Sequence, residues 1–172
     1  MASFVLPRDA DGQILPHDHP DLQGERRMIR GVHRRYIVMD ANRGCERLSS
    51  SLFKNSPRRQ GYLSFDSEYC LQNRGEDPIE YIGGSGWEGA VVITVERFRS
   101  FDPSQAVNNQ WKIGMVPLDQ EIPPKPCHGA VWGAISEGKA NEIRRATDWL
   151  VPIPDVVIDE TAMPYVGGRV ED

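Results

Sequence analysis

Apolar positions along this chain come in short runs separated by glycine, proline and polar residues. The longest run, residues 89–98, is almost continuously apolar in its first half and predicts a strand buried in the middle of a sheet. Shorter runs predict further strands at residues 36–39, 61–65, 111–116, 128–134 and 155–159.

Helical spacing is clearest in residues 139–150, where a face of i, i+3, i+4 and i+7 positions starts at Ile143. A second helix is predicted up to about Arg74, with Ser64 or Asp66 as its N-cap. Near the start of the domain, Met28, Ile29 and Val32 fall at i, i+1 and i+4, which predicts a short helix there.

Five to six short strands mixed with two to three helices predict an α+β fold with a mostly antiparallel, mixed sheet. The length of 172 residues fits one domain. We assign this domain to residues 26–159. An extended N-terminal arm is expected at residues 1–25, and a loose acidic tail at residues 160–172.

Composition argues against a membrane-spanning or secreted protein. The chain has no apolar run of about eighteen residues, and its first residues lack the features of a secretory signal. Cys45, Cys70 and Cys127 are odd in number and widely spaced, which fits neither a disulfide framework nor a zinc ribbon. We therefore expect a protein of the reducing cytoplasm.

Charge is divided unevenly along the chain. Residues 26–59 hold 10 of the 20 Lys and Arg residues, opposed only by Asp40 and Glu46, although the whole chain has a net charge of −5. Such a division lets one surface attract anions while the rest repels them. The basic segment is therefore the first place to look for a binding site.

Within this segment, guanidinium and hydroxyl groups suited to binding a phosphate or carboxylate occur close together. The candidate ligand-binding residues are Arg34, Arg35, Arg43, Arg47, Ser49 and Ser50. The alternative is that the arginines form a solvated face paired with acidic residues, while the serines cap a turn.

His128 is the candidate catalytic residue if the protein is an enzyme, because it stands at the mouth of a predicted strand and imidazole titrates near neutral pH. The alternative is a buried histidine bonded to a backbone carbonyl. Cys127 is a poor candidate for a nucleophile activated by His128. Neighbouring residues of a strand point to opposite faces, so the two side chains cannot easily form a hydrogen bond.

Neither a metal site nor a cofactor is expected. His17 and His19 have the i, i+2 spacing of two ligands, but a zinc site needs at least a third. The glycine-rich residues 83–86 lack the GK[ST] ending of a phosphate-binding loop and predict a flexible connection.

Several short motifs in this order resemble a family of small uncharacterised bacterial proteins. They are Pro16-His17-Asp18-His19, Asp40-Ala41-Asn42-Arg43-Gly44, Arg47-Leu48-Ser49-Ser50 with Phe53, Leu63-Ser64-Phe65-Asp66-Ser67-Glu68 and His128-Gly129-Ala130-Val131-Trp132-Gly133. The resemblance runs from about residue 12 to residue 157. It implies one compact bacterial domain with its signature residues around the Arg/Ser segment and His128, and it supplies no reaction.

A weaker similarity concerns ADP-ribosyltransferase-like toxins that consume NAD. Arg35, residues 62–64 and Glu68 can be laid onto their order of an arginine, a hydroxyl or aromatic residue and a glutamate. The spacing here is compressed, so the similarity is an analogy only.

These observations lead to two hypotheses. The first is a small cytoplasmic bacterial domain that binds an anionic small molecule or an acidic protein partner, as an accessory or sensor part of a multi-protein system. A nucleic-acid partner is not favoured because the chain is acidic overall, and no membrane partner is expected. The alternative is an enzyme acting on a phosphate-containing substrate, either a His-assisted phosphodiesterase or nuclease, or an NAD-using transferase.

Overall fold

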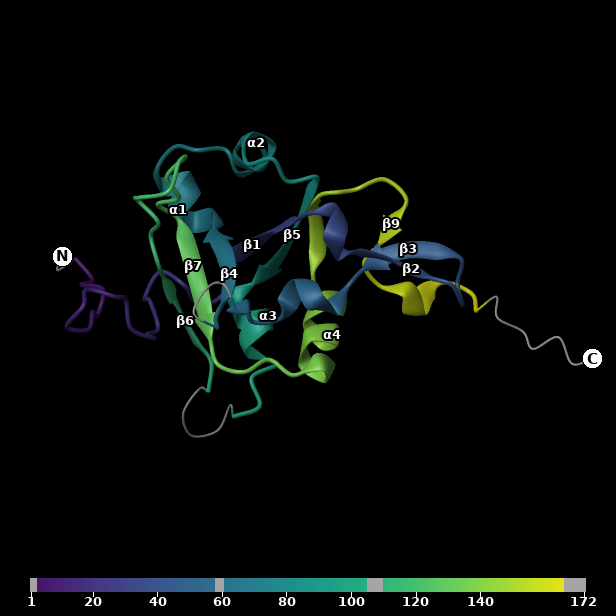
Figure 1. The fold of residues 1–172 in the computed structure, drawn as a ribbon, viewed down its shortest axis with the longest axis horizontal. Coiled ribbons are helices and arrows are strands. Elements are labelled where there is room, and N and C mark those ends of the chain that lie inside the picture. Colours follow the sequence, from purple (N-terminus) through teal and green to yellow (C-terminus); the bar gives the residue numbers. More distant parts are fainter. Residues whose placement is uncertain (1–2, 58–60, 105–109, 166–172) are drawn as a thin grey trace, which may run out of the picture.

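The computed structural model describes residues 3–57, 61–104 and 110–165. It contains a six-stranded sheet of order β6-β7-β4-β1-β5-β8, in which every neighbouring pair is antiparallel. A three-stranded sheet of order β2-β3-β9 lies to one side of it (Figure 1). With four α-helices added, this arrangement confirms the predicted α+β class.

The large sheet is formed by β1 (Arg27–Val32), β4 (Leu63–Ser67), β5 (Gly89–Thr94), β6 (Lys112–Met115), β7 (His128–Trp132) and β8 (Asp148–Val151). The small sheet is formed by β2 (Ile37–Asp40), β3 (Cys45–Leu48) and β9 (Val156–Val157). The helices are α1 (Glu68–Asn73), α2 (Pro78–Gly84), α3 (Val95–Arg99) and α4 (Glu137–Arg145), and the 3₁₀ turns are η1 (Arg34–Tyr36), η2 (Ser50–Phe53) and η4 (Glu160–Ala162).

The large sheet is buried on both faces. Along β5, Val91 and Ile93 belong to a core that includes residues of α3, α4 and η2, whereas Ala90 and Val92 point to the opposite face. That second face carries a smaller core, to which α1 and α2 contribute residues. In Figure 1 these two helices lie above the sheet. Burial on both faces explains the nearly continuous apolar run that marked β5 in the sequence.

The helix predicted around Met28 is wrong, because residues 27–32 form the central strand β1. Met28 and Val32 face the larger core, and Ile29 faces the smaller one. Apolar residues at i, i+1 and i+4 suit a strand buried on both faces as well as a helix, so periodicity could not separate the two. Similarly, the last predicted helix ends at Arg145, and its final residues belong to β8.

The N-cap of α1 is Ser67, whose Oγ accepts a hydrogen bond of 3.2 Å from the amide of Cys70. Ser64 and Asp66, the two caps expected from the sequence, instead lie within β4. Asp66 is only 3% exposed. Asp66 is therefore a buried carboxyl group that does not stabilise a helix end.

The two neighbours of β1 hold it unequally. It pairs with β5 along all its residues, but with β4 only through Met28↔Ser67 and Ile29↔Asp66. Beyond Ile29, the two strands no longer form a continuous ladder. A gap therefore opens in the middle of the large sheet.

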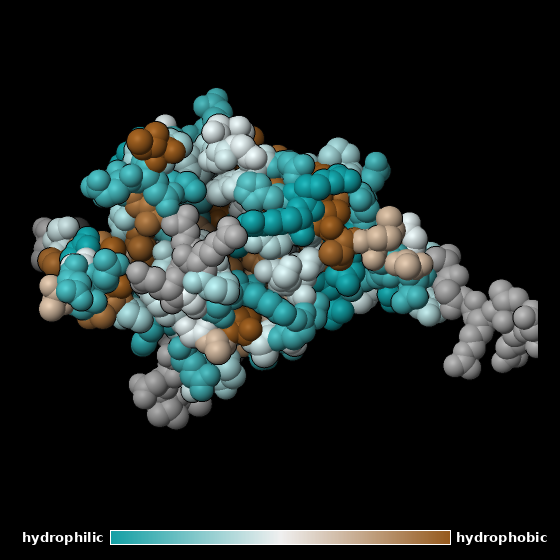
Figure 2. Space-filling view, in the orientation of Figure 1, coloured by the Kyte–Doolittle hydropathy of each residue, from teal (hydrophilic) through white to brown (hydrophobic). Residues whose placement is uncertain are grey.

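A disulfide joins Cys70 in α1 to Cys127, the residue immediately before β7, and this overturns the expectation drawn from the odd number and wide spacing of the cysteines. Cys45 is a free thiol. No helix in the described part of the chain is long and apolar enough to cross a membrane. On the face seen in Figure 2, hydrophilic residues predominate and the apolar ones lie in small separate patches.

The expected N-terminal arm and C-terminal tail both contact the domain where they are described. In the arm, His17 Nε2 lies 3.3 Å from the amide nitrogen of Met115, and Asp18 accepts a hydrogen bond from the amide of Ile113. In the tail, Glu160 is only 6% exposed and begins the ordered turn η4. Residues 166–172 of the tail lie outside the described residues.

Gly31 of β1 provides a test of this packing, because a methyl group at residue 31 would lie 1.9 Å from Cδ2 of Trp87. We expect Gly31→Ala to lower the free energy of unfolding by about 1–3 kcal/mol through overpacking. Urea denaturation followed by tryptophan fluorescence measures this. Gly83→Ala is the matched control, since a methyl group there meets nothing within 4 Å and alanine favours helix α2. Equal stabilities of the two variants would contradict the close approach of Trp87 to β1.

Candidate functional site

A cavity of about 270 Å³ lies where β1 and β4 separate. Its wall includes Ser64 and Asp66 of β4, Arg30 of β1 and His128 at the start of β7. Its remaining polar lining comes largely from the segment after β1 and from the loop before β7. Of the sequence-predicted site residues, the cavity brings together Arg35 and His128.

Three cationic side chains line this cavity: Arg30, Arg35 and Lys125. Arg30 donates through Nε to the carbonyl oxygen of Leu52 at 3.2 Å, and burial lowers the pKa of its guanidinium. Lys125 Nζ lies 3.7 Å from a carboxylate oxygen of Glu121.

Arg35 is exposed, and its guanidinium carbon lies 4.9 Å from the centre of the Tyr36 ring. Among the described residues, neither Arg30 nor Arg35 has a carboxylate oxygen within 4.0 Å. The cavity thus carries guanidinium charge that the described residues do not neutralise in close ion pairs.

Asp66 contributes the carboxyl group of the lining. Burial raises its pKa to about 6, and this outweighs the hydrogen bond that the Tyr81 hydroxyl donates to Oδ1 at 3.1 Å and the attraction of Lys125 and Arg30. Repulsion from Glu121 acts in the same direction as burial. Burial raises the pKa of the Tyr81 hydroxyl, and the charge and hydrogen bond of Asp66 add to this effect. Asp66 therefore changes charge within the range where enzymes and binding proteins operate.

His128 is 4% exposed, and its Nδ1 lies 3.0 Å from the carbonyl oxygen of Val116. This contact assigns the proton of the neutral ring to Nδ1, so that Nε2 is the basic nitrogen. The backbone contact is the one expected of a structural histidine. Its place in the cavity wall also gives it access to a bound molecule.

Trp87 forms an aromatic wall of the cavity. Its indole lies against Gly31, which has no side chain, and makes edge-to-face contacts with His33 and Tyr81. Lys125 Nζ lies 5.9 Å from the ring centre. The wall thus presents a flat apolar surface beside the cationic groups.

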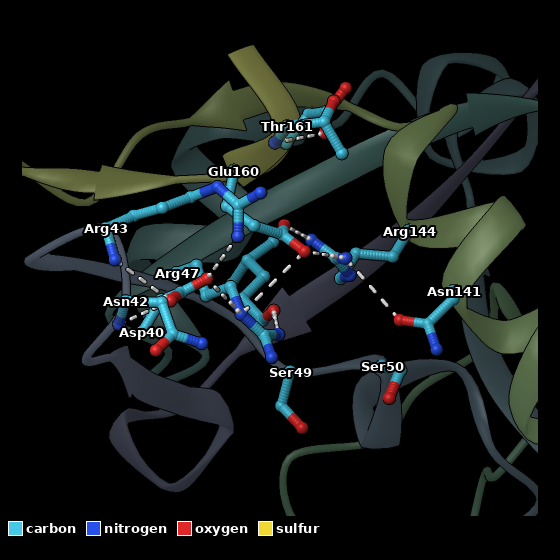
Figure 3. A network of polar contacts seen from close by, with 12 residues as sticks. Asp40, Asn42, Arg43, Arg47, Ser49, Ser50, Asn141, Arg144, Glu160 and Thr161 are labelled. Atoms are coloured by element: carbon cyan, nitrogen blue, oxygen red, sulfur yellow. Dashed lines mark hydrogen bonds and ion pairs between the residues drawn. The ribbon is translucent and has the colours of Figure 1, made fainter. Parts of the chain in front are cut away.

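Arg43 and Arg47 are placed elsewhere, in the polar network of Figure 3. Arg43 and Arg47 both pair with Asp40, at 3.4 Å and 3.7 Å, and Arg47 also lies 3.9 Å from Glu160. At the centre of this network, Arg144 of α4 is 0% exposed and donates to both carboxylate oxygens of Glu160. Of these two sequence-predicted arginines, Arg47 therefore joins β3 to the segment after β9 through an ion pair, whereas Arg43 pairs only with Asp40 at the end of β2.

The other candidates of the Arg/Ser segment also lie outside the cavity lining. Arg34 is exposed and pairs with Glu46 at 3.3 Å. Ser49 caps η2 by accepting a hydrogen bond from the amide of Ser51. Ser50 donates to Glu137, and Figure 3 shows the Ser49 and Ser50 hydroxyls directed away from the ion pairs. Arg58 and Arg59 of the basic segment lie outside the described residues.

No group of three His, Cys, Asp or Glu residues suited to holding a metal ion occurs in the described ranges. His17 packs against Gly114, and Asp18 pairs with Arg99 at 2.6 Å. Glu68, the glutamate of the ADP-ribosyltransferase analogy, pairs with Arg27 and does not line the cavity with Arg35.

Comparisons of this chain with protein-family models, curated proteins and solved structures found no match. The assignment of the site therefore rests on the chemistry of the residues that line the cavity. Sequence reasoning missed Arg30, Asp66, Trp87 and Lys125. Asp66 had two sequence signals: it belongs to the motif of residues 63–68, and it continues the alternation of a strand, where one face is expected to be buried.

The raised pKa of Asp66 predicts a pH dependence of stability. In the unfolded chain its carboxyl ionises near 3.8, and in the folded protein at about 6. Its contribution is fully present below pH 3.8 and is lost as the pH rises through 6, by about 3 kcal/mol in total. We expect Asp66→Asn to remove this dependence. The measurement is urea denaturation of both proteins from pH 4 to pH 8, and parallel curves would contradict the burial of an ionising Asp66.

The Arg144–Glu160 pair predicts a large effect on stability. Burial alone would raise the pKa of Glu160, but the hydrogen bonds from Arg144 lower it to about 2. Arg144→Met leaves this carboxylate without its principal partner, and we expect a loss of about 3–5 kcal/mol in the free energy of unfolding. The double variant Arg144→Met, Glu160→Gln should recover much of that loss.

The control is Arg145→Met. The Arg145 side chain is 44% exposed and lies 3.8 Å from Glu160. An exposed pair contributes about 0–1 kcal/mol. If Arg144→Met and Arg145→Met were equally destabilised, the buried Arg144–Glu160 pair would have no special role in stability.

Proposed function

We propose that the protein binds a small anionic ligand in the cavity between β1 and β4. The observation that carries this proposal is the pair of guanidinium groups, Arg30 and Arg35, that line the cavity and have no close ion pair among the described residues. Burial desolvates the Arg30 guanidinium, which is unfavourable unless an opposite charge accompanies it, and the exposed Arg35 adds a second positive charge at the cavity. A phosphate or carboxylate of a ligand would supply that charge.

Lys125 supports the same ligand class. Its ammonium group lies at the cavity wall, and the cations Arg30, Arg35 and Lys125 outnumber the one carboxyl group of the described lining, Asp66. Arginine guanidinium groups bind phosphate and carboxylate through two parallel hydrogen bonds, whereas lysine acts as a point charge. The lining therefore favours a compact oxyanion over a neutral or cationic ligand.

This proposal retains the ligand class expected from the sequence and changes the residues that hold it. Arg35 belongs to both sets. Arg43 and Arg47 already have carboxylate partners in Asp40 and Glu160. An anion bound there would have to compete with these internal pairs, which makes the cavity the better site.

The volume of the cavity restricts the size of the ligand. At about 270 Å³ it lies just below the range for small-molecule sites, roughly 300–1,000 Å³. A phosphate, sulfate or small phosphate ester suits such a space. The volume does not favour an entire dinucleotide such as the NAD of the transferase hypothesis.

The test is sulfate binding, measured by isothermal titration calorimetry at pH 8, where sulfate itself does not titrate. Arg35→Gln should weaken binding about 10–100-fold, because a hydrogen bond between charged groups contributes about 1.5–3 kcal/mol. Asp66→Asn should strengthen binding severalfold by removing a negative charge from the lining.

Arg34→Gln is the matched control, since it removes the same charge from the preceding residue, outside the cavity lining. We expect less than about a twofold change for this variant. Equal weakening by Arg34→Gln and Arg35→Gln would show a diffuse surface effect and would contradict a site in the cavity.

A further inference from the structure

Asp66 and His128 lie directly opposite each other on the paired strands β4 and β7. Residues opposite each other on antiparallel strands project to the same face, with Cβ atoms about 4.5–5.5 Å apart. Both residues are almost completely buried, and both line the cavity. The sheet thus places a carboxyl group and an imidazole side by side in the cavity wall.

Each of the two groups is oriented by a separate partner. The Tyr81 hydroxyl of α2 holds Oδ1 of Asp66, and the Val116 carbonyl holds Nδ1 of His128. Because these partners come from different elements, the orientation of the two groups does not depend on a bond between them. Residues fixed in this way meet the requirement of pre-organised acid and base groups.

The protonation of Asp66 and the hydrogen bonding of His128 support complementary roles. The pKa of Asp66, raised to about 6 by burial, keeps a fraction of about one tenth protonated at pH 7. This carboxyl group can therefore donate a proton near neutral pH. The contact of His128 Nδ1 with the Val116 carbonyl assigns Nε2 as the nitrogen that would accept a proton.

We propose that this cavity hydrolyses small phosphate monoesters, with His128 as the general base and Asp66 as the general acid. The proposal rests on the proposed anion site, in which Arg30, Arg35 and Lys125 bind the phosphate group. In the transition state, negative charge is redistributed over the phosphate oxygens, and these cations stabilise that charge.

The reaction balances with water as the only co-reactant. His128 Nε2 takes a proton from water as the water oxygen forms a bond to phosphorus. The bond between phosphorus and the ester oxygen breaks, and the proton of Asp66 passes to that leaving oxygen. The products are an alcohol and inorganic phosphate. Transfer of the proton from His128 to Asp66 restores the starting state.

The aromatic wall indicates the kind of alcohol. Trp87 and Tyr36 line the cavity beside the cations. A planar ring can stack on such side chains while its phosphate contacts the guanidinium groups. A phosphate monoester that carries a ring, of the size of a nucleoside monophosphate or smaller, fits these two features together.

The experiment compares two probes that differ in their leaving group. Phosphate release from nucleoside 5′-monophosphates requires protonation of an alkoxide, whereas p-nitrophenyl phosphate releases a phenolate that leaves without a proton. Both reactions are followed on the full chain in the presence of EDTA, to suppress metal-dependent phosphatases from the expression host.

Asp66→Asn should lower kcat about 10²–10⁴-fold with the nucleoside monophosphates, but less than about tenfold with p-nitrophenyl phosphate. His128→Gln should lower kcat with both probes. In the wild type, kcat for the monophosphates should fall as the pH rises above 6, where Asp66 loses its proton. Asp148→Asn, the same change at an exposed position of β8, should leave both rates unchanged.

Sulfate titration of the same preparations separates the two proposals. Retained sulfate binding by Asp66→Asn shows that this variant is folded. If the wild type binds sulfate through Arg35 but hydrolyses neither probe, the catalytic proposal is overturned and the anion site stands. Equal loss of both reactions in Asp66→Asn would also overturn the role of Asp66 as the acid. Absence of sulfate binding would reject the anion site itself.

Discussion

The unequal pairing of β1 is the constraint on which the rest of the molecule depends. This strand is bonded to β5 along its whole length, but to β4 at only two residue pairs. A fully paired β1 and β4 would close the sheet. The short ladder instead leaves a cavity whose wall includes Arg30 of β1, Asp66 of β4 and His128 of β7. The cavity is thus a property of the sheet, and the loops only complete its rim.

The arginines of the basic segment divide between two physical roles. Arg43 and Arg47 pair with Asp40 at the end of β2, and Arg47 and Arg144 pair with Glu160, which ties the small sheet and α4 to the C-terminal segment (Figure 3). Arg30 and Arg35 meet aromatic and backbone groups instead. The same side chain therefore serves as a structural tie where an acid is near and as a binding group where it is not. Local charge counts along the sequence cannot distinguish these situations, because they do not show which arginines the fold brings to a carboxylate such as Glu160, which is distant from Arg47 in the chain.

Much of the architecture follows from local patterns. The apolar run of residues 89–94 marked β5 directly, although the strand predicted to continue to residue 98 gives way to α3 at Val95. The strand β1 was not marked in this way, because its apolar residues face two cores and mimic the spacing of a helix. The site was predicted only in part, since Arg35 and His128 carried visible signals. Asp66 resembled a helix cap, and its burial depends on how β4 pairs with β1 and β7, which no local pattern encodes.

The bond between Cys70 and Cys127 has a consequence for the histidine beside it. These cysteines are 57 positions apart, so the bond closes a loop that contains α2, β5 and β6. In a chain-entropy description, closing a loop of this length restricts the unfolded chain by about 4 kcal/mol. Because Cys127 immediately precedes His128, the covalent link also anchors the end of the strand that carries the imidazole. Reduction of the bond would remove that anchor, and the histidine would then be positioned by hydrogen bonding and packing alone.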